Sequence, residues 1–199
     1  MLSHADDGFR IGAKLFAMGS MNPDLRRLRA AAMPHLHELV GRTGWATNLA
    51  VAVEDRVLVV EEVYSERMSA MPRMVGARLP LHATALGKAL LAGYPASELD
   101  ALLARGLRPF TPTTIVRPNL LRDQLAGIRA SSVAFSHEEW SPGTSGVASP
   151  VVVAGRVVAA VAAVGPSTEP GLRERGAHVR VAAARLSQAL SPAGAVIAA

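Results

Sequence analysis

The segment Ser136–Glu139 carries the residue types of a hydrolytic site, because a hydroxyl, an imidazole and two carboxylates follow one another. Nucleophilic catalysis needs a base within hydrogen-bond reach of the nucleophile. Neighbouring side chains of a strand point to opposite faces, so Ser136 and His137 are poorly placed to pair. We therefore expect no hydrolase triad here. Glu138 and Glu139 could form a paired acid site, but we expect loop carboxylates that accept backbone N–H bonds.

His35 and His37, followed by Glu38, form a second candidate, because imidazole and carboxylate groups bind metal ions. On a helix, residues two apart do not share a face. These histidines are therefore expected to be exposed to solvent, and no metal site is predicted. The chain contains no cysteine, which excludes disulfide bonds, thiolate ligands and a thiolate nucleophile.

The dipeptide Gly87-Lys88 is a third candidate, because a phosphate-binding loop ends in Gly-Lys followed by Ser or Thr. Such a loop would need glycine at position 82 and a hydroxyl at position 89, where the sequence has His82 and Ala89. No GxGxxG pattern follows a predicted strand, so dinucleotide binding is unsupported as well. The sequence therefore predicts no catalytic residue and no cofactor.

The stretch Leu79–Ala92 is the candidate ligand-binding segment around which the chain is organised. Pro80 argues against a helix before about residue 82, and the hydroxyl of Thr84 can cap a helix that starts there. The first N–H groups of that helix, those of residues 85–87, would lack an intrahelical partner and would carry the positive end of the helix dipole. They can hold a carboxylate or a carbonyl. Alternatively, Thr84 and water satisfy them.

The elements that position these residues are predicted from apolar periodicity and turn residues. Asn22-Pro23 should begin a helix that Pro34 kinks or breaks. A third, edge strand is expected over 68–75, because Pro72 cannot donate to a sheet ladder. The other predicted strands cover 45–53, 57–64, 133–136, 146–153 and 157–164, and the other predicted helices cover 11–20, 84–92, 96–104, 118–130 and 169–190.

This order of elements predicts an α+β fold in which helices flank an antiparallel sheet. The chain has 199 residues, half of them apolar, which suffices for one well-packed domain with a short appendage. Its net charge of +5 is spread among acidic residues, so charge alone does not predict DNA binding. No apolar run reaches the roughly 18 residues of a membrane span, and no signal peptide is visible. We expect a cytoplasmic protein.

The stretch at 79–92, LPLHATALGKALLA, resembles a block of the IclR-type bacterial transcription regulators. Further blocks of the same resemblance follow the family's order and span nearly the whole chain. The resemblance implies a GAF-like effector-binding domain over 23–199, preceded over 1–22 by the remnant of a winged-helix wing and a linker helix. It implies a homodimer or tetramer that contacts DNA only through a domain missing from this chain. The supporting blocks are Phe9-Arg10-Ile11-Gly12, Thr114-Ile115, and Glu138-Glu139 followed by Gly143, Ala148, Pro150 and Val151.

The resemblance also implies a ligand site. Members that sense small carboxylates hold the acid with backbone N–H groups, which correspond here to Ala85 and Leu86 beside Thr84. Their further polar side chains correspond to Ser136, Gly146, Ala162 and Val164, of which only Ser136 keeps a hydrogen-bonding side chain. The candidate walls of the pocket are Leu79, Leu81 and Met74.

A small, highly charged acid would lose several partners in such a pocket and would remain costly to desolvate. We therefore expect an effector with an apolar body and one carboxylate or carbonyl, such as an aromatic or fatty acid or a lactone-like metabolite. Two alternatives remain: a collapsed pocket without a ligand, and a small-molecule enzyme or orphan binding module on a GAF-like fold. An enzyme would need convergent titratable side chains in the pocket, of which the sequence offers few.

Overall fold

The structure is a computed structural model that describes residues 2–5, 8–11 and 21–191. Near the N-terminus, β1 (Leu2–Ala5) pairs with β2 (Gly8–Ile11) as an antiparallel hairpin. Of the helix expected over 11–20, residue 11 belongs to β2 and residues 12–20 lie outside the described residues.

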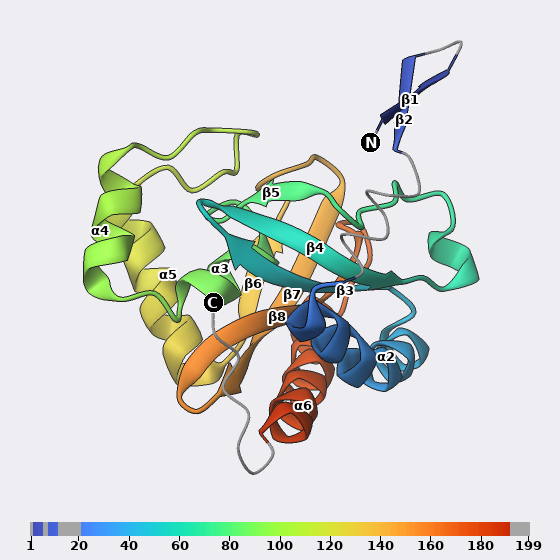
Figure 1. The fold of residues 1–199 in the computed structure, drawn as a ribbon. Helices are drawn as coiled ribbons and strands as arrows, with labels where there is room; N and C mark the ends of the chain where they lie inside the picture. Colours follow the sequence, from blue (N-terminus) through green and yellow to red (C-terminus); the bar gives the residue numbers. More distant parts are fainter. Residues whose placement is uncertain (1, 6–7, 12–20, 192–199) are drawn as a thin grey trace.

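Six antiparallel strands form the sheet on which the rest of the described chain packs (Figure 1). Its spatial order is β5-β4-β3-β8-β7-β6, so two hairpins, β3–β4 and β7–β8, meet at the centre of the sheet. This arrangement confirms the predicted antiparallel α+β fold. The strands are β3 (Ala46–Val53), β4 (Arg56–Val63), β5 (Arg78–Pro80), β6 (Ala134–His137), β7 (Thr144–Val153) and β8 (Arg156–Pro166).

Helices cover both faces of the sheet, as Figure 1 shows. On one face, α2 (Pro23–Thr43) and α6 (Leu172–Leu190) pack side by side over a core that includes Trp45 and Leu49. On the other face lie α3 (Ala85–Leu91), α4 (Ala96–Ala104) and α5 (Pro118–Ser131), and the core between them and the sheet is lined by leucine, valine and alanine. None of the described helices is long and apolar enough to cross a membrane.

Helix α2 begins where the sequence predicts. Asn22 caps it by accepting a hydrogen bond from the Leu25 N–H group at 3.0 Å, and Gly44 ends it in the left-handed conformation. The break expected at Pro34 is wrong, because the helix continues through that residue. Proline removes one helical hydrogen bond, whereas burial of the leucines on both sides of it, Leu28 and Leu36, holds the two halves against the sheet.

The edge strand lies elsewhere than predicted. The segment 68–75 follows a single 3₁₀ turn (Glu66–Met68) and joins no ladder, and β5 is instead the strand that pairs with β4. In that segment, the Met74 N–H group donates to the Glu62 side chain at 2.7 Å and not to a neighbouring strand. The loop is therefore fixed by a side chain, which brings Met71, Pro72 and Met74 to one end of a cavity.

Candidate functional site

The start of α3 has the geometry that the sequence predicts. Thr84 is extended, and its hydroxyl accepts a hydrogen bond from the Gly87 N–H group at 3.0 Å and donates to the Pro80 carbonyl at 2.9 Å. Gly87 is therefore satisfied by the cap. Only the N–H groups of Ala85 and Leu86 remain without a partner inside the helix.

Gly87 is required for the packing of α3. A Cβ atom at this position would overlap the carbonyl oxygen, the Cα atom and the carbonyl carbon of Leu81. Because backbone atoms cannot turn aside as the end of a side chain can, only glycine lets the helix lie so close to the segment before it. This contact places the first turn of α3 beside strands β7 and β8.

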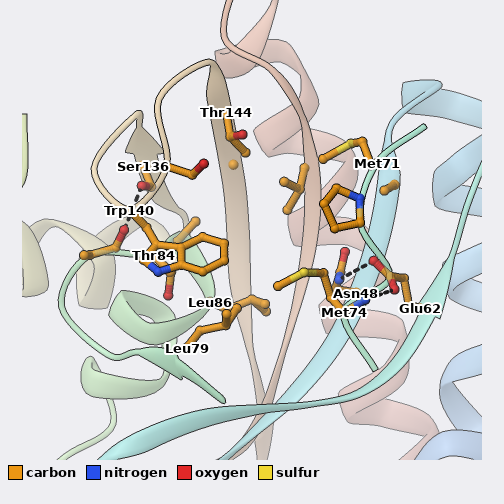
Figure 2. A pocket seen from close by; sticks show the side chains of 17 residues that line it. Asn48, Glu62, Met71, Met74, Leu79, Thr84, Leu86, Ser136, Trp140 and Thr144 are labelled. Atoms are coloured by element: carbon orange, nitrogen blue, oxygen red, sulfur yellow. Dashed lines mark hydrogen bonds between the residues drawn. The ribbon is translucent and has the colours of Figure 1, made fainter. Parts of the chain in front are cut away.

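A cavity of about 200 Å³ opens beside this first turn, between α3, the sheet and the loop that follows β6 (Figure 2). Its volume lies below the roughly 300 Å³ at which pockets for drug-sized ligands begin. A ligand with a single ring therefore suits it better than a larger one. The residues that line it are Ala46, Asn48, Glu62, Met71, Pro72, Met74, Leu79, Ala83, Thr84, Ala85, Leu86, Ser136, Trp140, Ser141, Thr144, Gly146 and Val164.

Most of the side chains expected at the site come together around this cavity. Two do not. Ala162 lies two residues before Val164 on the same face of β8, and it is buried in the core under α3. Leu81 lies beside His82 and Phe110 in a separate hollow of about 120 Å³. The expected residues that line the main cavity are Thr84, Ala85, Leu86, Ser136, Gly146, Val164, Leu79 and Met74.

Of the four positions that correspond to polar side chains in the family, Ser136 is the one that keeps a hydrogen-bonding side chain. It is buried at the cavity wall. Its hydroxyl donates to the Ala83 carbonyl at 3.2 Å, which leaves its oxygen able to accept a bond. His137, the next residue, is exposed and contacts the Ser145 hydroxyl at 2.8 Å. The two side chains thus lie on opposite faces of β6, as predicted, and they form no nucleophile–base pair.

A second polar group in the cavity was missed by the sequence analysis. Asn48 on β3 donates through Nδ2 to Glu62 Oε1 on β4 at 3.1 Å, and Glu62 Oε2 accepts from Met74 (Figure 2). Asparagine is depleted in strands. An asparagine within the small apolar run of β3 was therefore the signal that could have revealed it.

Strand β4 carries an irregularity that places Glu62 in the cavity. Leu49 pairs with Glu61 and Ala50 pairs with Val59, so Val60 is an extra residue between them. Such a bulge shifts the alternation of side chains along one strand. Beyond it, Glu62 lies opposite Asn48 on the cavity face.

The electrostatics of the cavity are dominated by one carboxylate. Among the described residues that line it, Glu62 alone carries a charged side chain. Nearby, burial and the negative charge of Glu62 raise the pKa of Tyr64 to about 12. Since none of these described residues is Lys or Arg, they would hold an acidic ligand by hydrogen bonds and apolar contacts, without a cation.

A buried ion pair fastens α3 to the loop after β6. Lys88 is fully buried, and its Nζ atom lies 2.6 Å from Glu139 Oε1 and 2.9 Å from Gln124 Oε1 on α5. Burial lowers the pKa of Lys88, while Glu139 acts in the opposite sense. The expectation that Glu138 and Glu139 accept backbone N–H bonds is therefore wrong: Glu139 pairs with Lys88, and Glu138 accepts from the Ser167 hydroxyl.

Three threonines hold the same loop from outside. The hydroxyls of Thr111 and Thr113 donate to the Glu138 carbonyl at 2.7 and 2.9 Å, and that of Thr114 donates to the Glu139 carbonyl at 2.6 Å. The loop then contributes Trp140 and Ser141 to the cavity wall.

Within residues 21–191, no group of three His, Asp or Glu side chains is placed to hold a metal ion.

Comparison with known proteins places this geometry in a family. Residues 24–188 match the model of the C-terminal domain of the bacterial transcriptional regulator IclR. The HTH-type transcriptional repressor AllR of Klebsiella pneumoniae is 34% identical over 187 residues, which cover 92% of this chain and 69% of the relative. AllR of Escherichia coli K12 is 34% identical over 190 residues, with the same shares.

Solved structures agree with the sequence matches. An IclR homologue from Microbacterium hydrocarbonoxydans, in complex with 4-hydroxybenzoate, superposes with a TM-score of 0.85 at 29% identity over 95% of this chain and 79% of that one. Thermotoga maritima IclR gives 0.82 at 30% identity, over 96% and 80%. The C-terminal domain of E. coli KdgR gives 0.73 at 26% identity, over 83% and 99%.

The six-stranded curled sheet, with its helices on both faces, is thus the GAF-like domain of these regulators. The cavity lies beside the motif that carried the resemblance. The chain belongs to the IclR family of bacterial transcriptional regulators, and residues 24–188 form its effector-binding domain.

Proposed function

We propose that the cavity beside α3 binds a small organic acid with a hydrophobic or aromatic body, and that this binding alters operator recognition by the regulator. The observation that carries the proposal is the cavity itself, about 200 Å³ in volume, with mostly apolar walls. At one end, Thr84, Ala85 and Leu86 meet Ser136, so backbone N–H groups and a hydroxyl are available to an acid.

The character of the walls favours an apolar ligand over a two- or three-carbon acid. Gly146 and Val164 line the cavity where relatives that sense small carboxylates are expected to carry polar side chains, and they contribute no hydrogen bond. A compact carboxylate would leave its hydration shell without replacement partners. An aromatic ring gains from burial against Leu79, Leu86 and Met74. The 4-hydroxybenzoate complex of the M. hydrocarbonoxydans homologue supports this ligand class.

A small-molecule enzyme on the same fold is the alternative. The relatives are transcriptional repressors, and among the lining residues in the described part of the chain Glu62 is the single titratable side chain. General acid–base or nucleophilic chemistry ordinarily requires two or more such groups in contact. We therefore assign the cavity to sensing and to no reaction.

Effector binding in the cavity would regulate DNA binding by changing how the subunits assemble. We infer that the chain forms a homodimer or tetramer, in which the effector favours one arrangement and so changes the spacing of the DNA-binding heads. Those heads would be winged helix-turn-helix units, with residues 1–22 as the end of the wing and the linker. Such a regulator acts on DNA, so its site of action would be the cytoplasm. Light scattering with and without effector measures the assembly directly.

Calorimetric titration with a panel of acids tests the ligand class. Aromatic monocarboxylates and medium-chain fatty acids are expected to bind with micromolar dissociation constants, whereas glyoxylate and pyruvate should give no heat at millimolar concentration. Tight binding of glyoxylate or pyruvate, without a response to aromatic acids, would contradict the proposal.

A further inference from the structure

The end of the cavity remote from α3 holds a polar atom that nothing in the domain accounts for. Asn48 is 3% exposed, and its Oδ1 atom is buried without a hydrogen-bond partner in the described part of the chain. Buried polar atoms in folded proteins nearly always have a partner. The exception here lies in the wall of the cavity.

The orientation of the Asn48 amide is fixed by its neighbours. Glu62 Oε1 lies 3.1 Å from Asn48 Nδ2, and the other carboxylate oxygen accepts from the Met74 N–H group. A carboxylate only accepts hydrogen bonds, so the NH₂ side of the amide must face Glu62. The carbonyl oxygen therefore faces away from Glu62, at the end of the cavity where Figure 2 shows Met71 and Met74.

The bond to Glu62 gives the NH₂ group of Asn48 a structural role, whereas the surroundings supply none for its carbonyl group. Its neighbours on the same face of β3 are Ala46 and Ala50, and its partner on β8 is Ala162. An alanine at position 48 would continue this small apolar surface. The Asn48 amide is held by Glu62, which the bulge in β4 places opposite Asn48. Glu62 in turn binds the N–H group of Met74 in the loop before β5.

We propose that Asn48 Oδ1 and Glu62 form a recognition site for a hydrogen-bond donor, so that the effector carries a hydroxyl or amino group at the end opposite its carboxylate. This inference rests on the proposed effector-binding function and narrows its ligand class. Both protein groups are acceptors, so the ligand must donate. A second carboxylate here would meet Glu62 with no cation in the lining to offset the repulsion. The site therefore selects hydroxylated or amino-substituted monoacids and rejects diacids.

Calorimetry with three ligands that share a benzoate core tests this inference on the unmodified chain. We expect 4-hydroxybenzoate to bind at least about tenfold more tightly than benzoate, because it satisfies an orphaned acceptor. Terephthalate, which places a carboxylate at the same position, should bind more weakly than benzoate. Equal affinities for benzoate and 4-hydroxybenzoate would overturn the inference and leave the proposed function intact. Failure of all three ligands and of a medium-chain fatty acid to bind would overturn both.

Two variants test whether Asn48 and Glu62 cause the expected preference for 4-hydroxybenzoate over benzoate and terephthalate. Asn48→Leu has a similar volume without the carbonyl, and it should bind benzoate and 4-hydroxybenzoate with affinities within about twofold of each other. Glu62→Gln keeps hydrogen-bonding atoms and removes the charge, so its affinity for terephthalate should rise by about fivefold or more. Asn119→Leu, an exposed position on α5, is the matched control and should keep the wild-type preference. A wild-type preference retained in Asn48→Leu would contradict the assignment.

Discussion

Lys88 Nζ lies 2.6 Å from Glu139 Oε1, and this buried pair joins α3 to the loop after β6, both of which line the cavity. The Lys88 side chain is fully buried and the Glu139 side chain is 8% exposed. The second carboxylate oxygen of Glu139 has no partner in the described residues. Movement of the loop therefore requires either that α3 follows or that a buried charge is left alone.

Lys88→Met should destabilise the domain by about 3–5 kcal/mol, because it leaves Glu139 charged and unpaired in the interior. The double variant Lys88→Met/Glu139→Leu should recover most of that loss, since it removes both charges. Urea denaturation measures both. Arg122→Ala breaks the exposed pair with Asp100 and should cost less than about 1 kcal/mol. A single Lys88→Met variant as stable as wild type would show that the pair is dispensable.

Gly87→Ala should prevent α3 from docking, because the new methyl group would overlap the Leu81 backbone. We expect a loss of about 3 kcal/mol or more in the free energy of unfolding. Gly127→Ala is the matched control within α5, where a Cβ atom meets nothing within 4 Å. That variant should gain about 0.5–1 kcal/mol, because alanine favours a helix. Equal effects at the two positions would contradict the proposed close approach.

Thr84→Ala removes the cap of α3 and the donor to the Pro80 carbonyl, so we expect a loss of about 1 kcal/mol. Thr84→Ser keeps the hydroxyl and should lose only a fraction of that. Thermal unfolding of the three proteins gives the comparison. If Thr84 contributes only through the packing of its methyl group, the serine and alanine variants will be equally destabilised, and the capping role of the hydroxyl will be contradicted.

His82 should make the domain less stable in acid. Burial lowers its pKa below the usual 6.5, against the opposing effects of the Arg108 carbonyl and Glu139. Below about pH 6.5 the unfolded chain therefore binds a proton that the folded chain does not. The contribution of His82 is fully present above pH 6.5 and is lost as the pH falls toward the folded pKa.

The check compares wild type with His82→Gln, whose amide can still donate to the Arg108 carbonyl as the Nε2–H group does at 2.9 Å. The difference between their unfolding free energies should change between pH 7 and pH 5, and the variant should have the flatter profile. His37→Gln, at an exposed position on α2, is the control for replacing a histidine. Parallel profiles for wild type and His82→Gln would contradict the assignment.

Local signals in the sequence predict most of the fold. The Asn22 cap, the Thr84 cap and the break between the strands predicted over 146–153 and 157–164 each depend on a few adjacent residues, and each is found where predicted. Of the two outcomes expected at Pro34, the break does not occur, because tertiary burial of the helix outweighs the loss of one backbone bond. The segment 68–75 misled because its backbone is held by Glu62, a partner that no local pattern reveals.

The residues of the candidate site also fall into those that a local sequence signal predicts and those that depend on distant partners. Thr84, Ala85 and Leu86 could be predicted, because the helix start lies within one continuous stretch. Asn48 left a signal, as a polar residue within an apolar strand, but its pairing with Glu62 could not be predicted, since it depends on a bulge at Val60 that has no signature in the sequence. The pairing of Lys88 with Glu139 joins residues 51 positions apart, so no local pattern could predict it.

The central claim is that the cavity beside α3 is where the effector binds, and a cavity-filling variant tests it most directly. Val164→Phe places a ring in the cavity, whereas Val152→Phe adds the same ring at a position on β7 that is 38% exposed. In calorimetric titration with 4-hydroxybenzoate, wild type and Val152→Phe should bind equally, and Val164→Phe should bind at least about a hundredfold more weakly while remaining folded. Unchanged affinity in a folded Val164→Phe protein would place the ligand elsewhere and contradict the account.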